Sequence, residues 1–107
     1  MLKNKGKNKL SMVEGDYGLT LPLIISGITV EKTDKLNFYI KKELNGEKII
    51  DKTFDSITDN TINLVFTKED SDKLPVGKYK YAIDWYKENS FCGNLIKLQE
   101  FEVEDKL

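Results

Sequence analysis

The stretch KLPVGKYKYAIDW, residues 73–85, carries the most regular pattern in this sequence. A Pro-x-Gly turn signal is followed at once by large residues at every second position, which is typical of a loop that leads into a β-strand with one buried face. These large residues are Tyr79, Tyr81, Ile83 and Trp85. We expect them to fill a core. The outer face of the same strand is then expected to carry Lys78, Lys80, Ala82 and Asp84.

Two other interpretations concern the aromatic residues of this strand. If these aromatic residues were on the surface, they would stack sugars or bases. Only Ala82 and Tyr86 would then remain as apolar inward residues, which is too little apolar surface to anchor a central strand. The leucine, proline and glycine just before Tyr79 also resemble the loop-to-strand corner of immunoglobulin-like domains, where a tyrosine hydroxyl bonds back to the preceding loop. The resemblance implies that Tyr79 or Tyr81 makes this bond.

Hydrophobic residues keep a period of two along the chain from Leu10 onward, which predicts strands rather than helices. The residues expected to face inward are Leu10, Met12, Leu19, Leu21, Leu23, Ile25, Leu36, Phe38, Ile40, Ile62, Leu64, Phe66, Phe101 and Val103. In the strand that contains Phe38, the outward residues are expected to be Asn37, Tyr39 and Lys41. Residues 47–54 are expected to pair with that strand, and residues 91–103 to form the last strand with a bulge at Gly93.

Breaks in the alternation predict the turns. Gly15-Asp16, Asn45-Gly46 and residues 87–90 are turn signals. Thr67 and Asp70 have the spacing of a capping box for one short helical turn, and Leu74 is the only large anchor after it. Proline has no N–H for a sheet ladder, so Pro22 predicts an edge or a bulge on its side of the strand.

These elements predict an all-β fold, an antiparallel immunoglobulin-like β-sandwich of about seven strands. A small five-stranded barrel is the alternative. The chain of 107 residues has room for a single domain, which we place at residues 10–107. Residues 1–9 hold four lysines and almost nothing to bury, so we expect them to form a disordered basic arm.

The composition excludes several classes of function. All 17 basic residues are lysine, because the chain has no arginine and no histidine. Without the bidentate fork of arginine, sequence-specific binding of nucleic acid is not expected. No apolar run is long enough to span a bilayer, and the N-terminus does not resemble a secretory signal. The chain is therefore expected to be made in a reducing cytoplasm.

The residues that could carry chemistry are few. Histidine, the commonest general base and metal ligand, is absent, and Cys92 is the only cysteine. We expect Cys92 to be an unreactive, partly buried or reducible thiol, with no disulfide and no thiolate metal cluster. An enzyme would have to use the carboxylates of Glu69, Asp70 or Asp84, which have no partner nucleophile. We therefore predict no enzymatic activity, no catalytic residues, no metal and no cofactor.

The order of the predicted strands resembles that of small immunoglobulin-like domains in the baseplate and tail proteins of bacteriophages, such as the N-terminal domain of upper baseplate proteins. The resemblance covers residues 10–104. Its most specific parts are Gly15-Asp16, the lysine-ended strand from Phe38 to Lys42, and the block from Thr67 to Ile83. It implies a non-enzymatic structural component that binds other proteins during assembly.

The resemblance also implies the partners and the location. The expected partners are other proteins of a phage tail or baseplate and further copies of this chain. The expected location is the host cytoplasm during assembly and then the virion. Two alternatives remain open: a carbohydrate-binding or adhesion module that uses Tyr17, Tyr86 or Phe91, and a small inhibitor from a mobile element.

Overall fold

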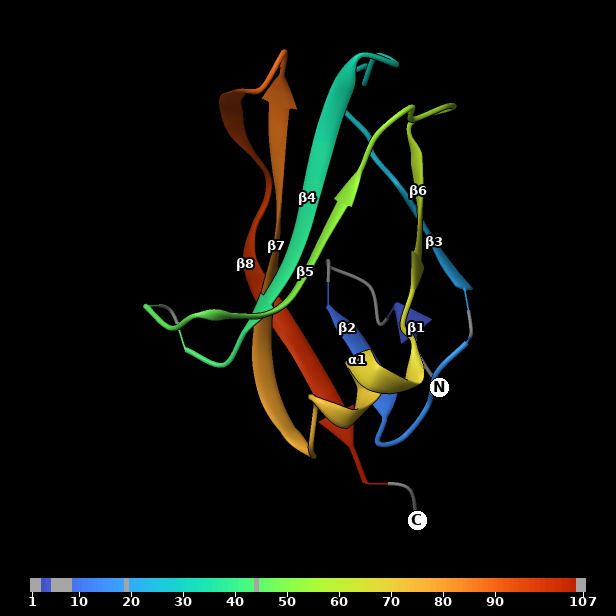
Figure 1. Ribbon diagram of the computed structural model, residues 1–107, viewed down its shortest axis with the longest axis vertical. Helices are drawn as coiled ribbons and strands as arrows, with labels where there is room; N and C mark the ends of the chain where they lie inside the picture. The colour runs from blue at the N-terminus through green and yellow to red at the C-terminus, as the bar shows by residue number, and fades with distance from the viewer. Residues whose placement is uncertain (1–2, 5–8, 19, 44, 106–107) are drawn as a thin grey trace.

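The computed structural model describes residues 3–4, 9–18, 20–43 and 45–105 (Figure 1). These residues form strands and one short helix. In chain order the elements are β1 (Lys3–Asn4), β2 (Leu10–Val13), β3 (Thr20–Ile24), β4 (Asp34–Lys41), β5 (Lys48–Phe54), β6 (Thr61–Val65), α1 (Lys68–Asp72), β7 (Gly77–Lys87) and β8 (Ser90–Glu104).

The strands form two sheets that enclose one core. The larger sheet has six strands in the order β1-β2-β8-β7-β4-β5, and the smaller sheet has two strands, β3 and β6. The predicted all-β sandwich is therefore confirmed. One pairing differs from the expected antiparallel arrangement, since β2 runs parallel to β8. This pairing joins the beginning of the domain to its end, and local sequence patterns carry no information about it.

The core lies between the sheets and is rich in aromatic rings. Phe38 and Tyr81 stack with ring centroids 5.6 Å apart, and Phe66 and Phe101 lie 5.8 Å apart. The residues buried from the smaller sheet and its flanks include Leu23, Ile25, Ile62 and Leu64. The inward faces predicted from the alternation are confirmed at every one of these positions. Trp85 is only partly buried, although it follows the same alternation.

The outer face of the larger sheet is more buried than expected. Asn37, Tyr39, Ala82 and Asp84 lie on this face, yet each exposes less than a tenth of its surface. Long neighbouring side chains cover them: the Nζ atoms of Lys48 and Lys41 lie 4.4 Å and 5.4 Å from the centroid of the Tyr39 ring. Alternation predicts on which face of the sheet a residue lies, whereas its burial also depends on the length of the neighbouring side chains.

The connections follow the turn signals closely. Asp16 N–H donates to the Val13 carbonyl, and Gly46 N–H to the Glu43 carbonyl. Glu88 and Asn89 have left-handed backbones and join β7 to β8 in a tight hairpin. The capping box of α1 is confirmed, because Thr67 accepts from the Asp70 backbone while the Asp70 side chain accepts from the Thr67 backbone.

The predicted arm lies largely outside the described residues. Lys3 and Asn4 form a two-residue strand that pairs with Leu10 and Ser11 of β2, unlike the coil expected for them. A two-residue strand needs only backbone partners, so the absence of apolar side chains does not prevent it. Residues 1–2 and 5–8 are not described.

Candidate protein-interaction surface

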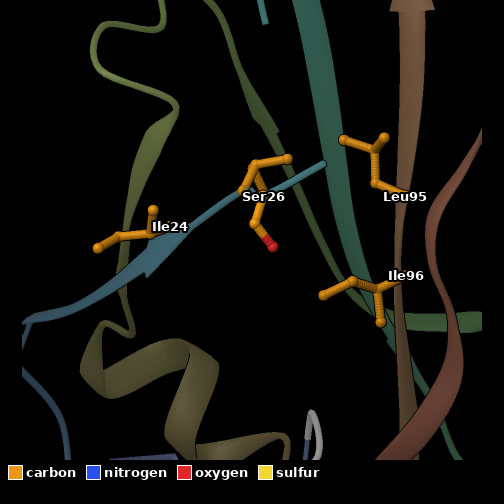
Figure 2. A pocket seen from close by; sticks show the side chains of 5 residues that line it. Ile24, Ser26, Leu95 and Ile96 are labelled. Atoms are coloured by element: carbon orange, nitrogen blue, oxygen red, sulfur yellow. The ribbon is translucent and has the colours of Figure 1, made fainter. Parts of the chain in front are cut away.

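A slot lined mainly by aliphatic residues opens between the two sheets where β3 ends beside β8 (Figure 2). Its volume is about 130 Å³. Figure 2 shows Leu95 and Ile96 of β8 on one side, with Ile24 and Ser26 at the end of β3 on the other. The slot is lined by Ile24, Ile25, Ser26, Leu95 and Ile96.

Ile24 gives the rim of the slot an unusual exposure for an isoleucine. Ile24 is 75% exposed, the largest value among the large hydrophobic residues at the surface of the part of the chain that the structure describes. The alternation of β3 places Leu23 and Ile25 in the core, so Ile24 must point outward. Leu95 and Ile96 are partly buried against the core. Apolar side chains at the rim and the wall make the slot suitable for an apolar side chain of another molecule.

A free strand edge borders the slot. β2 pairs with β8 only over residues 101–104. In the part of the chain that the structure describes, residues 90–100 of β8 therefore have β7 as their only strand neighbour. Alternate backbone groups of a strand point to opposite sides, so part of this backbone faces away from β7. The slot thus combines backbone groups that face away from β7 with aliphatic side chains.

The outer face of the larger sheet carries a second, polar hollow of about 340 Å³. Its lining residues are Lys35, Asn37, Asp51, Thr53, Tyr86 and Asn89. Lys48 Nζ donates to Asn37 Oδ1 at 2.9 Å, and Asn37 Nδ2 donates to the Asp51 carboxylate. Burial, with a contribution from the nearby Asp84 carboxylate, raises the pKa of Tyr39 on this face.

The structure brings together two of the three aromatic residues proposed for carbohydrate binding. Tyr86 and Phe91 form an edge-to-face pair with centroids 5.7 Å apart at the β7–β8 hairpin. Tyr17 is exposed in the loop after β2. That loop lies at the opposite end of the molecule, near α1 (Figure 1), where Gly18 N–H donates to the Phe66 carbonyl. Tyr17 therefore cannot share a site with Tyr86 and Phe91.

Two of the three carboxylates considered for catalysis are neighbours in α1, the third lies in β7, and each has a structural partner or is exposed. Burial alone would raise the pKa of Asp70, but Lys52 at 2.6 Å and the Thr67 backbone outweigh it and lower the pKa. Asp84 lies on the outer face and accepts from Asn94 Nδ2 at 2.6 Å. Glu69 is exposed in the first turn of α1.

Cys92 is exposed rather than partly buried, because it lies in the irregular pairing near the β7–β8 hairpin. Within residues 3–4, 9–18, 20–43 and 45–105, no group of three or more acidic or cysteine side chains could hold a metal ion. The helix found in the same ranges is too short to cross a membrane.

Asn60 organises the loop beside the slot and was missed in the sequence. Its Nδ2 atom donates to the carbonyls of Ile25 and Ile28, while its Oδ1 atom accepts from the Val30 backbone at 2.9 Å. Its φ angle of 52° is in the left-handed region, which asparagine tolerates better than most residues. The Asp59-Asn60 pair before the alternating segment is a turn signal. This turn signal is the only sign in the sequence that Asn60 organises the loop.

Searches of protein-family models, of curated proteins and of solved structures each found no match to this chain.

Proposed function

We propose that this chain is a non-enzymatic protein-interaction module that receives an extended apolar segment of a neighbouring protein in the slot between β3 and β8. The observation that carries this proposal is the 75% exposure of Ile24 at the rim of a slot lined mainly by aliphatic residues. Strand addition at an open edge supplies backbone hydrogen bonds, and a side chain in a pocket supplies specificity. The free edge of residues 90–100 and the slot provide these two components.

We further propose that the sandwich is of the immunoglobulin-like type. The order β8-β7-β4 in one sheet and the pair β3-β6 in the other correspond to strands G-F-C and B-E of that fold. Tyr79 Oη donates to the Pro75 carbonyl at 2.6 Å, the corner bond that the resemblance implies for Tyr79 or Tyr81. Both observations support the type without depending on any sequence match.

From the resemblance to phage baseplate and tail domains we propose that the module belongs to a tail or baseplate. Its partners would be other proteins of that assembly. It would be present in the host cytoplasm during assembly and then in the virion. This assignment rests on the order of the strands and motifs in the sequence.

Site-specific photo-crosslinking tests this function. A photoreactive phenylalanine analogue is placed at Ile24, with Val76 as the matched control, since Val76 is also exposed but lies in the loop after α1. In cells that express the native gene neighbourhood, position 24 should crosslink to one defined protein and position 76 should not. A virion protein supports the tail assignment, whereas another protein leaves only the interaction module. Equal crosslinking at both positions would contradict the slot.

The polar hollow favours a second candidate function, the binding of a saccharide. Tyr86 offers an aromatic ring, and Asp51, Thr53 and Asn89 offer polar groups of the kind that contact sugar hydroxyls. A glycan array that compares the native chain with Tyr86→Ala and Tyr17→Ala tests this candidate. Signal that is lost only in Tyr86→Ala supports it, and no signal from the native chain rejects it.

A further inference from the structure

The outer face of the two-stranded sheet carries no charged residue. β3 and β6 pair antiparallel, and every second residue of each strand points away from the core. The residues on this uncharged face are Thr20, Pro22 and Ile24 of β3 and Thr61, Asn63 and Val65 of β6. Thr61 is partly buried and the other five are exposed. The uncharged face is therefore accessible to another molecule.

The lack of charge is unusual for this chain, because 33% of its residues are charged. The outer face of the larger sheet carries the cross-strand pairs Lys78/Glu102 and Lys80/Glu100. In contrast, the sequences of β3 and β6, TLPLI and TINLV, contain no charged residue. Depletion of charged residues is typical of the centre of a protein interface. The small sheet therefore offers a different kind of surface from the larger sheet.

The uncharged face is continuous with the slot. Ile24 belongs to both, because it is the last residue of β3 and also lines the slot. Thr61 lies opposite Ile24 in the ladder, and Pro22/Asn63 is the next pair on the same face. A molecule seated in the slot is thus directly beside the uncharged face.

The size of the uncharged face decides whether it could hold a partner by itself. Each of its two strands has five residues. At about 3.3 Å per residue and about 4.8 Å between strands, the flat area is on the order of 200 Å². A stable interface buries about 800 Å² on each partner. A second copy that used this face alone would therefore be held weakly, so the face fits as one part of a larger interface.

We propose that the uncharged face and the slot form one interface, in which the neighbouring protein seated in the slot also covers β3 and β6 with uncharged groups. This inference rests on the proposed function, because it assigns a second contact to the same partner. A charged group placed against the face would lose hydration without gaining an ion pair. Pro22, Ile24 and Val65 instead favour apolar groups, and the threonine and asparagine side chains offer neutral hydrogen bonds.

Site-specific photo-crosslinking at Val65 tests the proposal in cells that express the native gene neighbourhood. The photoreactive phenylalanine analogue is placed at Val65, at Ile24 or at Val76, and mass spectrometry identifies the crosslinked residues. Val76 is the matched control, since it is an exposed valine outside the uncharged face. Positions 24 and 65 should reach the same protein, and the residues reached from position 65 should be uncharged.

A second measurement places a charge on the uncharged face. Val65→Lys, or Val76→Lys as the control, is added to the chain that carries the analogue at Ile24. Val65→Lys should lower the crosslinking yield at position 24 severalfold, whereas Val76→Lys should leave it unchanged. Circular dichroism checks that both variants fold. Asn63→Lys, on the same face, replaces Val65→Lys if that variant does not fold.

The outcomes separate this inference from the proposed function. Specific crosslinking at position 24, with position 65 no higher than position 76, would overturn the inference and leave the slot in place. The absence of specific crosslinking at position 24 would contradict the proposed function, and the inference with it. Position 65 reaching a second copy of this chain, a different protein or charged residues would overturn the inference, as would equal effects of the two lysine variants.

Discussion

Trp85 of β7 donates its indole N–H to Asp34 of β4 across a distance of 3.0 Å. Asp34 is 2% exposed and also accepts from the Glu31 backbone at 3.0 Å, while Lys87 Nζ lies 3.6 Å away. A buried carboxylate is stable only with such partners. The sole tryptophan therefore reports on an ionic site rather than on the centre of the apolar core.

Replacing Asp34 tests this site. Asp34→Ala leaves the Trp85 indole N–H and the Glu31 backbone N–H without their acceptor, and we expect a cost of about 1–3 kcal/mol in the free energy of unfolding. Urea denaturation followed by Trp85 fluorescence measures it. The matched control is Asp55→Ala, which removes an exposed carboxylate and should change stability little. Equal effects of the two substitutions would contradict the role of Asp34.

The same site should make stability depend on pH. Burial would raise the pKa of Asp34, but the Glu31 backbone, Trp85 and Lys87 together lower it. Because the folded pKa is below the unfolded one, the contribution of the carboxylate is complete above about pH 4 and is lost as the pH falls through the folded pKa. The stability difference between the native chain and Asp34→Asn should therefore shrink in acid. A difference that is constant across this range would contradict the lowered pKa.

Tyr79 anchors the corner before β7 through its bond to Pro75. Tyr79→Phe keeps the ring and removes the hydroxyl, so we expect a loss of about 1 kcal/mol in the free energy of unfolding. Tyr86→Phe removes a hydroxyl from the polar hollow and serves as the control in the same urea titration. If Tyr79→Phe is as stable as the native chain, the corner bond contributes nothing.

Asn60 is a donor to two carbonyls, so a carboxylate at this position should be unfavourable. We expect Asn60→Asp to cost about 1–3 kcal/mol at neutral pH, because an acceptor would replace the donor that faces Ile25 and Ile28. Protonation restores a donor, so the cost should decrease in acid. Thermal unfolding of Asn60→Asp and of the exposed control Asn63→Asp measures the difference. A cost that grows in acid would refute this explanation.

Burial raises the pKa of Tyr81 to about 12 from its ordinary value of 10. The folded state then keeps the phenol neutral while the unfolded state ionises. Stability should be unaffected below pH 10 and should fall as the pH rises toward 12. Ultraviolet absorbance of tyrosinate, compared between the native chain and Tyr81→Phe, tests this. A tyrosinate signal at pH 10 that disappears in Tyr81→Phe would contradict the burial of this hydroxyl.

Much of the fold could be predicted because the sequence alternates where one face of a strand is buried. Phe38 and Tyr81 stack in the core as their positions in the pattern require. The helical turn was predictable because Thr67 and Asp70 interact locally. Each of these predictions depends on residues close together in the chain.

The predictions failed where distant segments decide the outcome. Asn60 contacts residues about thirty positions away, and no local pattern marks them. Asp34 and Trp85 are 51 residues apart in the chain. Their hydrogen bond explains why Trp85 is only partly buried, unlike the other large residues on the same face of β7. Tyr17 and Tyr86 share a residue type, but the topology places them at opposite ends. The slot likewise depends on a distant pairing, because β2 pairs only with residues 101–104 of β8 and leaves the rest of that strand, in the described part of the chain, without a second neighbour.

Amide hydrogen exchange along β8, measured by NMR, is the most direct test of the open edge that the proposed function requires. In the described part of the chain β7 is the only strand neighbour of residues 90–100, so the amides of this segment that face away from β7 should exchange rapidly in the isolated protein. They should become protected when the protein that crosslinks at Ile24 is added. Protection of the whole segment in the isolated protein would show that the edge is already covered, and rapid exchange in the presence of that protein would show that no strand pairs with it.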